Sequence, residues 1–304
     1  MTRSTAIERS FAACARGRTG LLRIIGALLL VFGLAGCSAI KLGYSTLPEL
    51  SYWWLQGYVD FSDEQAPRVR EELARLHAWH RANELPLLAE TLARMATLAP
   101  GAVTAAQACG FEPEVRARLN ALVLQAEPVI ATLGATITGR QLRYLERRFA
   151  RKNADWRAEH IEAPAAEQQE KRYREWLDRM ESFYGTPDDA QRALLRDMVA
   201  RSVYDPQLVL QERQRRQQDL LQVLRRLPHE RLDTGAARAL VHGWFERVQR
   251  SPDPAYRVYE EAVIQQLCRN VARLHESASA EQRARAARRL RAYERDLREL
   301  AAPR

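Results

Sequence analysis

Two histidines and a glutamate lie at helical spacing in one short segment of the sequence. His77, His80 and Glu84 occupy positions i, i+3 and i+7, so a helix would place all three side chains on one face. Two imidazoles and a carboxylate are ligands that zinc accepts, although the spacing is not the H-E-x-x-H of metalloproteases. The segment predicts a candidate metal site. The alternative is a pair of surface histidines beside a glutamate.

A cysteine near the N-terminus could carry a covalent lipid. A basic stretch with five arginines and one glutamate precedes an apolar run over residues 24–34. That run is shorter than the roughly 20 residues of a membrane-spanning helix and suits a signal peptide. It ends in Leu34-Ala35-Gly36-Cys37, which resembles the lipobox of bacterial lipoproteins. The resemblance implies cleavage between Gly36 and Cys37 and acylation of Cys37 with chains such as palmitate. An ordinary signal peptide and an N-terminal membrane anchor are the alternatives.

The anchor predicts where the protein works and what it meets. Ser38 follows the cysteine, and by the same resemblance this favours the periplasmic face of the outer membrane over the inner membrane. Removing the signal lowers the net charge from +9 to about +5. The remaining arginines alternate with acids, as in residues 68–72, which is typical of a solvated helix face with ion pairs. We expect a membrane partner through the anchor, envelope proteins as further partners, no nucleic acid, and no cofactor besides the lipid on Cys37.

Aromatic residues are concentrated just after Cys37. Tyr52, Trp53, Trp54 and Tyr58 are candidate partner-binding residues, because Trp and Tyr dominate binding hot spots. The same rings would suit the membrane–water interface. They could also pack into the core of a helical bundle, and the sequence leaves the three interpretations open.

Two further cysteines, Cys109 and Cys268, would remain after the signal is removed. An even pair in an oxidising compartment is a candidate disulfide. Two separate buried thiols are the alternative.

Helix-forming residues dominate the chain after the signal, and apolar residues recur at steps of three and four, as at Leu290, Tyr293 and Leu297. Prolines, among them Pro128 and Pro228, mark expected helix boundaries. The prediction is an all-α fold, a multi-helix bundle of amphipathic helices joined by short turns after a cleaved signal peptide. We expect a signal peptide over residues 1–36, an anchored aromatic segment over 37–61 and a helical domain over 62–304.

A short pattern of the form S/T-x-x-Q recurs at the expected helix starts, with one Asp variant. Its five copies begin at Ser62, Thr104, Thr138, Asp188 and Ser279. A capping box explains the pattern, because the first side chain accepts from the third backbone N–H while the glutamine returns to the cap. The pattern is also similar, in its T-x-x-Q part, to a motif of exported helical stress chaperones.

One longer block resembles a family of uncharacterised proteobacterial lipoproteins. Residues 43–48, 53–55, 58–65, 77–81 and 84–86 carry this resemblance. It implies a lipid-anchored helical protein and brings no activity with it.

The predicted function is therefore a non-catalytic helical interaction or scaffold module of the envelope. No catalytic motif is found, so we do not expect an enzyme. The alternatives are a periplasmic chaperone for unfolded clients, and a metal-binding protein or enzyme that uses His77 and His80.

Overall fold

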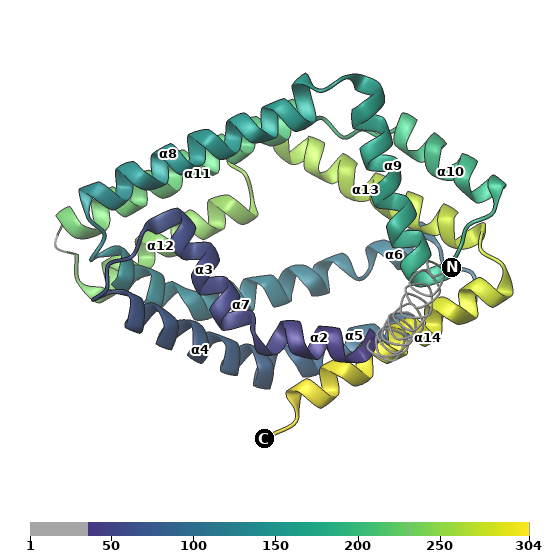
Figure 1. Cartoon of the computed structure of the whole chain (residues 1–304), viewed down its shortest axis with the longest axis horizontal. Coiled ribbons are helices and arrows are strands. Elements are labelled where there is room, and N and C mark those ends of the chain that lie inside the picture. The colour runs from purple at the N-terminus through teal and green to yellow at the C-terminus, as the bar shows by residue number, and fades with distance from the viewer. Residues whose placement is uncertain (1–35, 231, 304) are drawn as a thin grey trace, which may run out of the picture. The chain divides into compact units, whose positions relative to one another are not determined.

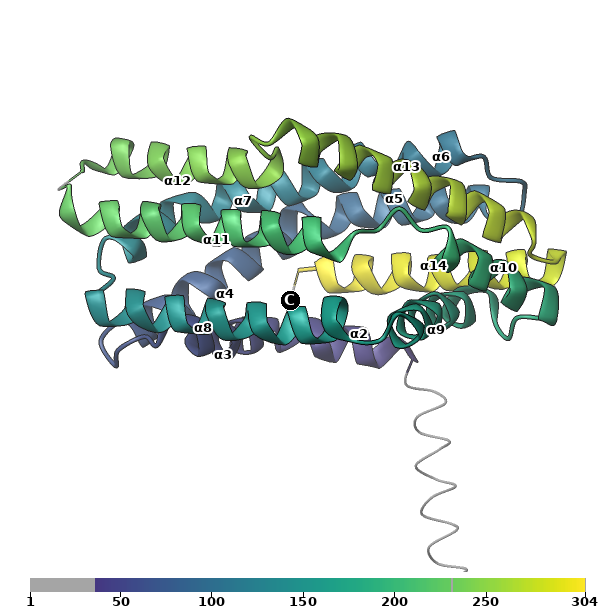
Figure 2. The same ribbon diagram turned by 90° about the horizontal axis from the view of Figure 1, so that it is seen from above.

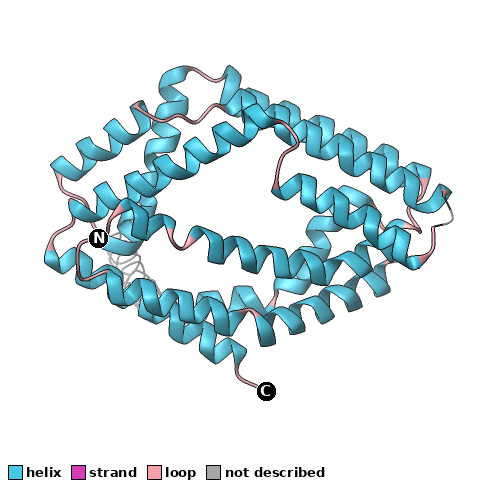
Figure 3. Ribbon diagram, turned by 180° about the vertical axis from the view of Figure 1, so that it is seen from behind, coloured by secondary structure: helices cyan, strands magenta, loops and turns pink. Residues whose placement is uncertain are grey.

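The chain divides into two compact units, Met1–Thr46 and Leu47–Arg304. The structure, a computed structural model, describes residues 36–230 and 232–303. The predicted signal peptide lies outside the described residues, except for Gly36. In the first unit the described part is one helix, α2 (Gly36–Ser45). Every regular element in the described ranges is helical and none is a strand, which confirms the predicted all-α class (Figure 3).

The second unit contains all the other helices. In chain order they are α3 (Leu47–Val59), α4 (Ala66–Asn83), α5 (Leu85–Leu98), α6 (Ala105–Cys109), α7 (Glu112–Gly134), α8 (Gly139–Arg157), the π-helical turn η1 (Ala158–Glu162), α9 (Ala165–Tyr184), α10 (Asp189–Ala200), α11 (Pro206–His229), α12 (Thr234–Gln249), α13 (Pro254–Glu276) and α14 (Ala280–Ala301). Helix α3 packs against α4 and α8. The helical unit therefore begins at Leu47, whereas the sequence suggested a boundary at residue 62.

Four of the five predicted capping boxes form at helix starts. Thr104, Thr138, Asp188 and Ser279 each accept from the backbone N–H three residues on, and the glutamine there accepts from the cap's own N–H. These boxes begin α6, α8, α10 and α14, which satisfies backbone donors that a helix leaves unpaired at its start.

The fifth copy of the motif lies before its helix. Gln65 accepts from the Ser62 N–H at 3.1 Å, but α4 begins only at Ala66 and Ser62 is not its cap. Pro67 explains the shift, since it has no N–H to donate and fits the first turn of a helix.

Two prolines do not end helices as the sequence suggested. Pro128 lies inside α7, and Pro228 lies in the last turn of α11. A proline at position 128 leaves the carbonyl of Leu124 without its helical donor. Leu124 is exposed, so water can reach that carbonyl, and the helix continues.

Four motif glutamines pair with one another across the fold. Gln141 donates to Gln65, Nε2 to Oε1 at 2.6 Å, and also to the Asp60 carbonyl at 3.1 Å. Gln191 and Gln282 donate to each other at 2.8 and 3.1 Å, and Gln191 also donates to a backbone carbonyl at 2.9 Å. We call these two sets the glutamine clasps. Each joins the start of one helix to the start of another that is far away in the sequence.

The clasps reveal two corresponding halves of the second unit. The first half is α3 to α8 and the second half is α9 to α14. Helix α3 packs on α4 and α8 while α4 packs on α7; likewise α9 packs on α10 and α14 while α10 packs on α13. Both α3 and α9 are followed by a residue with positive φ, Asp60 at 54° and Gly185 at 88°. The two halves therefore repeat one arrangement of six helices.

Each half completes its packing with the other. Helix α8 pairs with α11 and α5 pairs with α14, while α7 pairs with α12 and α6 pairs with α13 (Figure 1). Figure 2 shows α3, α8 and α9 on one side of this unit and α6, α12 and α13 on the opposite side. One apolar cluster, which includes Leu145, Leu224 and Val241, lies where α7, α8, α11 and α12 meet. Because it contains residues of both halves, its burial stabilises their association.

Candidate interaction surface

Helix α3 presents an apolar face to solvent. Leu47, Leu50, Trp53 and Trp54 are 43%, 56%, 64% and 63% exposed. At 3.6 residues per turn, these four side chains fall within about a third of the helix circumference. Gly57 continues the same face, and a side chain built there would meet nothing within 4 Å. We call these four residues the α3 face.

Two other aromatic side chains of α3, on the far side from the α3 face and at its edge, fix the helix to the unit. Tyr52 is buried, with its ring stacked near Phe61 at 6.4 Å and the Arg70 guanidinium 3.7 Å from its ring centroid. Tyr58 is half-buried and its ring lies 6.1 Å from that of Phe149 on α8. The four predicted aromatics therefore divide: Tyr52 and Tyr58 pack inward, as the core interpretation required, while Trp53 and Trp54 point outward.

A basic stripe lies on α8, a helix that α3 contacts. Arg140, Arg143, Arg147 and Arg151 are exposed and recur at i, i+3, i+7 and i+11. Asp60 is 3.5 Å from Arg140; no acidic partner within ion-pair distance is found among the described residues for the other three arginines. We call these four the α8 arginines. The alternation of arginines with acids in the sequence suggested ion-paired faces, although the spacing of these four arginines alone indicates the stripe.

The three candidate metal ligands lie around the junction of α4 and α5. His77 and His80 are in α4, and Glu84 is the residue between the two helices. Glu84 is buried, and its carboxylate lies 3.4 Å from the Arg118 guanidinium. Burial lowers the pKa of His80, which favours its neutral form. Across residues 36–230 and 232–303, no group of three or more His, Cys, Asp or Glu side chains is placed to hold a metal ion.

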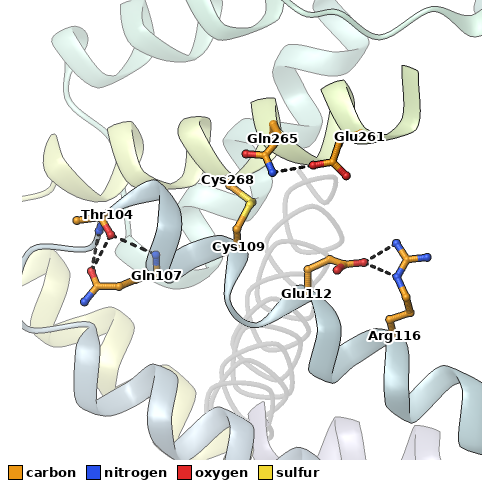
Figure 4. The surroundings of a disulfide bond; sticks show 8 residues. All are labelled: Thr104, Gln107, Cys109, Glu112, Arg116, Glu261, Gln265 and Cys268. Atoms are coloured by element: carbon orange, nitrogen blue, oxygen red, sulfur yellow. Dashed lines mark hydrogen bonds and ion pairs between the residues drawn. A yellow bond between two sulfur atoms is a disulfide. The ribbon is translucent and has the colours of Figure 1, made fainter. Parts of the chain in front are cut away.

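Cys109 and Cys268 form a disulfide, the pairing that the sequence left open. The sulfurs are 2.04 Å apart, and the bond joins the end of α6 to α13 (Figure 4). The capping box of Thr104 and Gln107 lies on the same short helix (Figure 4). The bond therefore holds one of the contacts between the first and second halves.

The α7–α12 contact corresponds to the α6–α13 contact, and a histidine–glutamate pair lies there where the other contact has its disulfide. Glu127 on α7 is buried, and its carboxylate lies 2.7 Å from His242 Nδ1 on α12. Glu127 lies fourteen residues before Gln141, and Cys268 lies fourteen before Gln282. The two halves therefore place a carboxylate and a cysteine at equivalent positions.

Two grooves flank α11. One has a volume of about 480 Å³ and lies between α8 and α11, with Phe149, Asn153 and Gln217 in its wall. The second, of about 270 Å³, is lined in part by Trp244 and Tyr256. Asn153 donates to Gln217 at 2.7 Å, so amide groups in the first groove already bond to each other.

A buried acid beside the second groove is fully engaged in structure. Burial raises the pKa of Glu212, but hydrogen bonds from Arg215, Arg216 and Ser251 outweigh it and hold the pKa below its usual value. Its partners donate at 2.7 to 3.0 Å. This arrangement stabilises the contact between α11 and the segment before α13, because a buried charge must be paired.

The fold and surface define a class of protein: an all-helical unit of two corresponding halves with an exposed aromatic helix. The chain belongs to a family of unknown function, DUF6279, which matches residues 57–238. The match begins near the end of α3 and ends early in α12, so all four residues of the α3 face precede it. No curated protein and no solved structure matches the chain significantly.

The predicted anchor region is only partly described. The backbone of Gly36 and Cys37 lies in α2, while Leu34 and Ala35 lie outside the described residues. In the part of the chain that the structure describes, no helix is long and apolar enough to cross a membrane.

Proposed function

We propose that this protein is a lipid-anchored, non-catalytic interaction module at the periplasmic face of the outer membrane. Cys37 carries the lipid, and the α3 face is the contact surface. The observation that carries the proposal is the exposure of Trp53 and Trp54 on a helix that begins ten residues after Cys37. Large aromatic side chains are costly to leave in water and dominate binding surfaces.

The rest of the unit supports a scaffold role. Glu212 and Asp219 are held by arginines, and the motif glutamines bond to each other and to backbone carbonyls. Groups engaged in this way hold helices together and have little capacity left for substrate or client. The function therefore resides on the surface of α3, supported by a rigid pair of halves.

The test of the anchor is metabolic labelling with an alkyne-bearing palmitate, followed by fractionation of the envelope. We expect label on the wild-type chain in the outer membrane fraction and none on Cys37→Ser. Cys14→Ser is the matched control, because Cys14 would leave with the signal, and it should be labelled normally. Equal labelling of the Cys37→Ser variant and the wild type would reject the anchor.

The test of the contact surface is the double substitution Trp53→Ser and Trp54→Ser in cells. Both side chains are exposed, so we expect normal abundance together with loss of the contacts that a photo-reactive residue at position 50 captures in the wild type. A residue of the same kind at position 258, which is 72% exposed on α13, is the control position. Capture that is equal at the two positions and insensitive to the substitutions would contradict the proposal.

A further inference from the structure

We propose that the α3 face lies in the interfacial region of the bilayer that holds the anchor, with the α8 arginines near anionic headgroups. The occupant of this surface is thus lipid. The proposal rests on the proposed function, because it names the partner of the same surface. Its geometry needs only residues of the second unit and the length of chain that leads to it.

The composition of the face matches the region between hydrocarbon and water. Trp is enriched there because its ring is apolar and its N–H can still bond to water or headgroups. Leu47 and Leu50 lie on the same side of α3 and add aliphatic surface that can enter the acyl boundary. A helix with such a face lies parallel to the membrane surface and does not cross it.

The second half contains an internal comparison. Helix α9 occupies the place in the second half that α3 has in the first, and none of the exposed large apolar residues in the described chain belongs to it. Its aromatics face inward: Tyr173 is buried, and Trp176 and Tyr184 pack on the same apolar cluster. This fold position therefore does not require outward apolar residues, and their presence on α3 calls for a surface to cover them.

The tether brings that surface within reach of lipid. Leu47 lies ten positions after Cys37, and even a fully extended chain over ten positions spans at most about 35 Å. A tether this short makes contact between α3 and the bilayer an intramolecular event, with an effective concentration on the order of millimolar. A weak intrinsic affinity is then enough to keep the face covered.

The charge beside α3 favours an anionic surface. Three of the four α8 arginines have no acidic side chain within ion-pair distance among residues 36–230 and 232–303, and α8 contacts α3 through Tyr58 and Phe149. Each basic residue near an anionic membrane strengthens binding by about fivefold at physiological salt. Helices α3 and α8 contact each other, and Figure 2 shows both on one side of the unit.

The experiment uses the mature protein purified from envelopes and reconstituted into vesicles of phosphatidylethanolamine and phosphatidylglycerol with a brominated lipid. Bromine quenches only tryptophans that reach the acyl region. We expect partial quenching of the wild type, and loss of the quenched component in Trp53→Phe with Trp54→Phe. Trp176→Phe on α9 is the matched control and should keep it. Quenching that is absent from the wild type, or unchanged by the double substitution, overturns the proposal.

A second set of variants keeps both reporter tryptophans and changes only what drives insertion. Leu47→Ser with Leu50→Ser should lower the quenched fraction, whereas Val258→Ser with Leu267→Ser, exposed residues of α13, should leave it unchanged. An equal effect of the two pairs would overturn the assignment to α3.

The arginines are tested with two triple variants that lower the net charge by the same amount. Replacing Arg143, Arg147 and Arg151 by Gln should weaken docking by about tenfold or more in vesicles with anionic lipid. The same change at Arg288, Arg291 and Arg295, exposed on α14, is the matched control and should have little effect. Equal effects of the two triple variants would overturn the role of the α8 arginines.

Failure of the anchor and failure of docking are distinguishable in this experiment. Mass spectrometry of the purified protein shows whether Cys37 is acylated. Acylation without quenching leaves the anchor and rejects the docking, whereas quenching without acylation supports docking by α3 alone and rejects the anchor.

Discussion

Helices α3 and α9 occupy the same place in two corresponding halves, yet they meet their surroundings differently. In α9 the aromatic residues Tyr173, Trp176 and Tyr184 pack on a buried cluster, and the exposed side is polar. In α3 Tyr52 performs the packing, while Trp53 and Trp54 are exposed. Since one half shows that the fold needs no outward aromatics, those on α3 are best explained by a contact outside the unit.

The two corresponding contacts between the halves also differ, in the type of bond that each contains. The α6–α13 contact holds a disulfide, whereas the α7–α12 contact holds the pair Glu127 and His242. A covalent bond restricts the unfolded chain, while an ion pair with one half-exposed partner contributes little. The two contacts are therefore alike in arrangement but unequal in strength: the α6–α13 contact joins the halves more firmly than the α7–α12 contact does.

Of the variants that compare the two contacts, removal of the disulfide should have the largest effect on stability. Cys109→Ala with Cys268→Ala releases a closed loop with a sequence separation of 159 residues. Loop-closure entropy of that size stabilises a fold by about 4–5 kcal/mol. Urea unfolding should show a loss of about that size in the variant, and reductant should destabilise the wild type but leave the variant unchanged. A wild-type midpoint that does not respond to reductant would contradict this.

The glutamine clasps should come next in size. Gln191 is 2% exposed and takes part in the second clasp. Because Gln191→Ala leaves its buried hydrogen-bond partners unsatisfied, it should lower the free energy of unfolding by about 2–3 kcal/mol. Gln107→Ala removes an exposed capping glutamine that pairs with no other motif and should cost about 0.5–1 kcal/mol. Gln141→Ala in the first clasp should match Gln191→Ala. Equal losses at Gln107 and Gln191 would show that capping, and not the clasp, stabilises the fold.

The helix pairs α5–α14 and α8–α11 should differ in how well they tolerate a larger side chain. Ala89 is fully buried on α5, whose main neighbour is α14, and Ala89→Leu should destabilise by about 1–3 kcal/mol through overpacking. Ala150 lines the open groove between α8 and α11, so Ala150→Leu should change stability by no more than about 0.5 kcal/mol. Thermal unfolding of the two variants side by side measures the difference. A larger loss for Ala150→Leu would mean that the groove closes in solution.

Local chemistry could be predicted from the sequence better than long-range arrangement. The boxes at Thr104, Thr138, Asp188 and Ser279 follow from side chains within three residues of each other, and the all-α class follows from periodicity. The pairing of the motif glutamines did not follow, because nothing in a capping box indicates that its free amide reaches another box far along the chain. The correspondence of the halves was hidden for the same reason: it is a pattern of contacts between helices whose sequences differ.

The candidate surface could be predicted only in part. Trp53 and Trp54 were identified by type and by position near the predicted anchor, but their exposure could not be separated from the burial of Tyr52 without the direction of each side chain. Helical spacing around α3 gives that direction only when the partner helices α4 and α8 are known. The exposed α8 arginines were equally hidden, since ion pairing depends on which acids lie nearby.

The smallest expected effect is a pH dependence at the α7–α12 contact. The hydrogen bond from His242 to the Glu127 carboxylate, together with its negative charge, raises the pKa of His242 above 6.5. Glu246, 3.6 Å from Nε2, acts in the same direction. A raised folded-state pKa means that this stabilisation is fully present below the unfolded pKa and is lost as pH rises through the folded one. The free energy of unfolding of the wild type, relative to His242→Asn, should therefore fall as pH rises from about 6.5 through that window. Because His242 is nearly half exposed, solvent screening keeps the change smaller than the three above. Urea titrations at several pH values measure this change. A stability advantage of the wild type that grows with pH would contradict a raised pKa of His242.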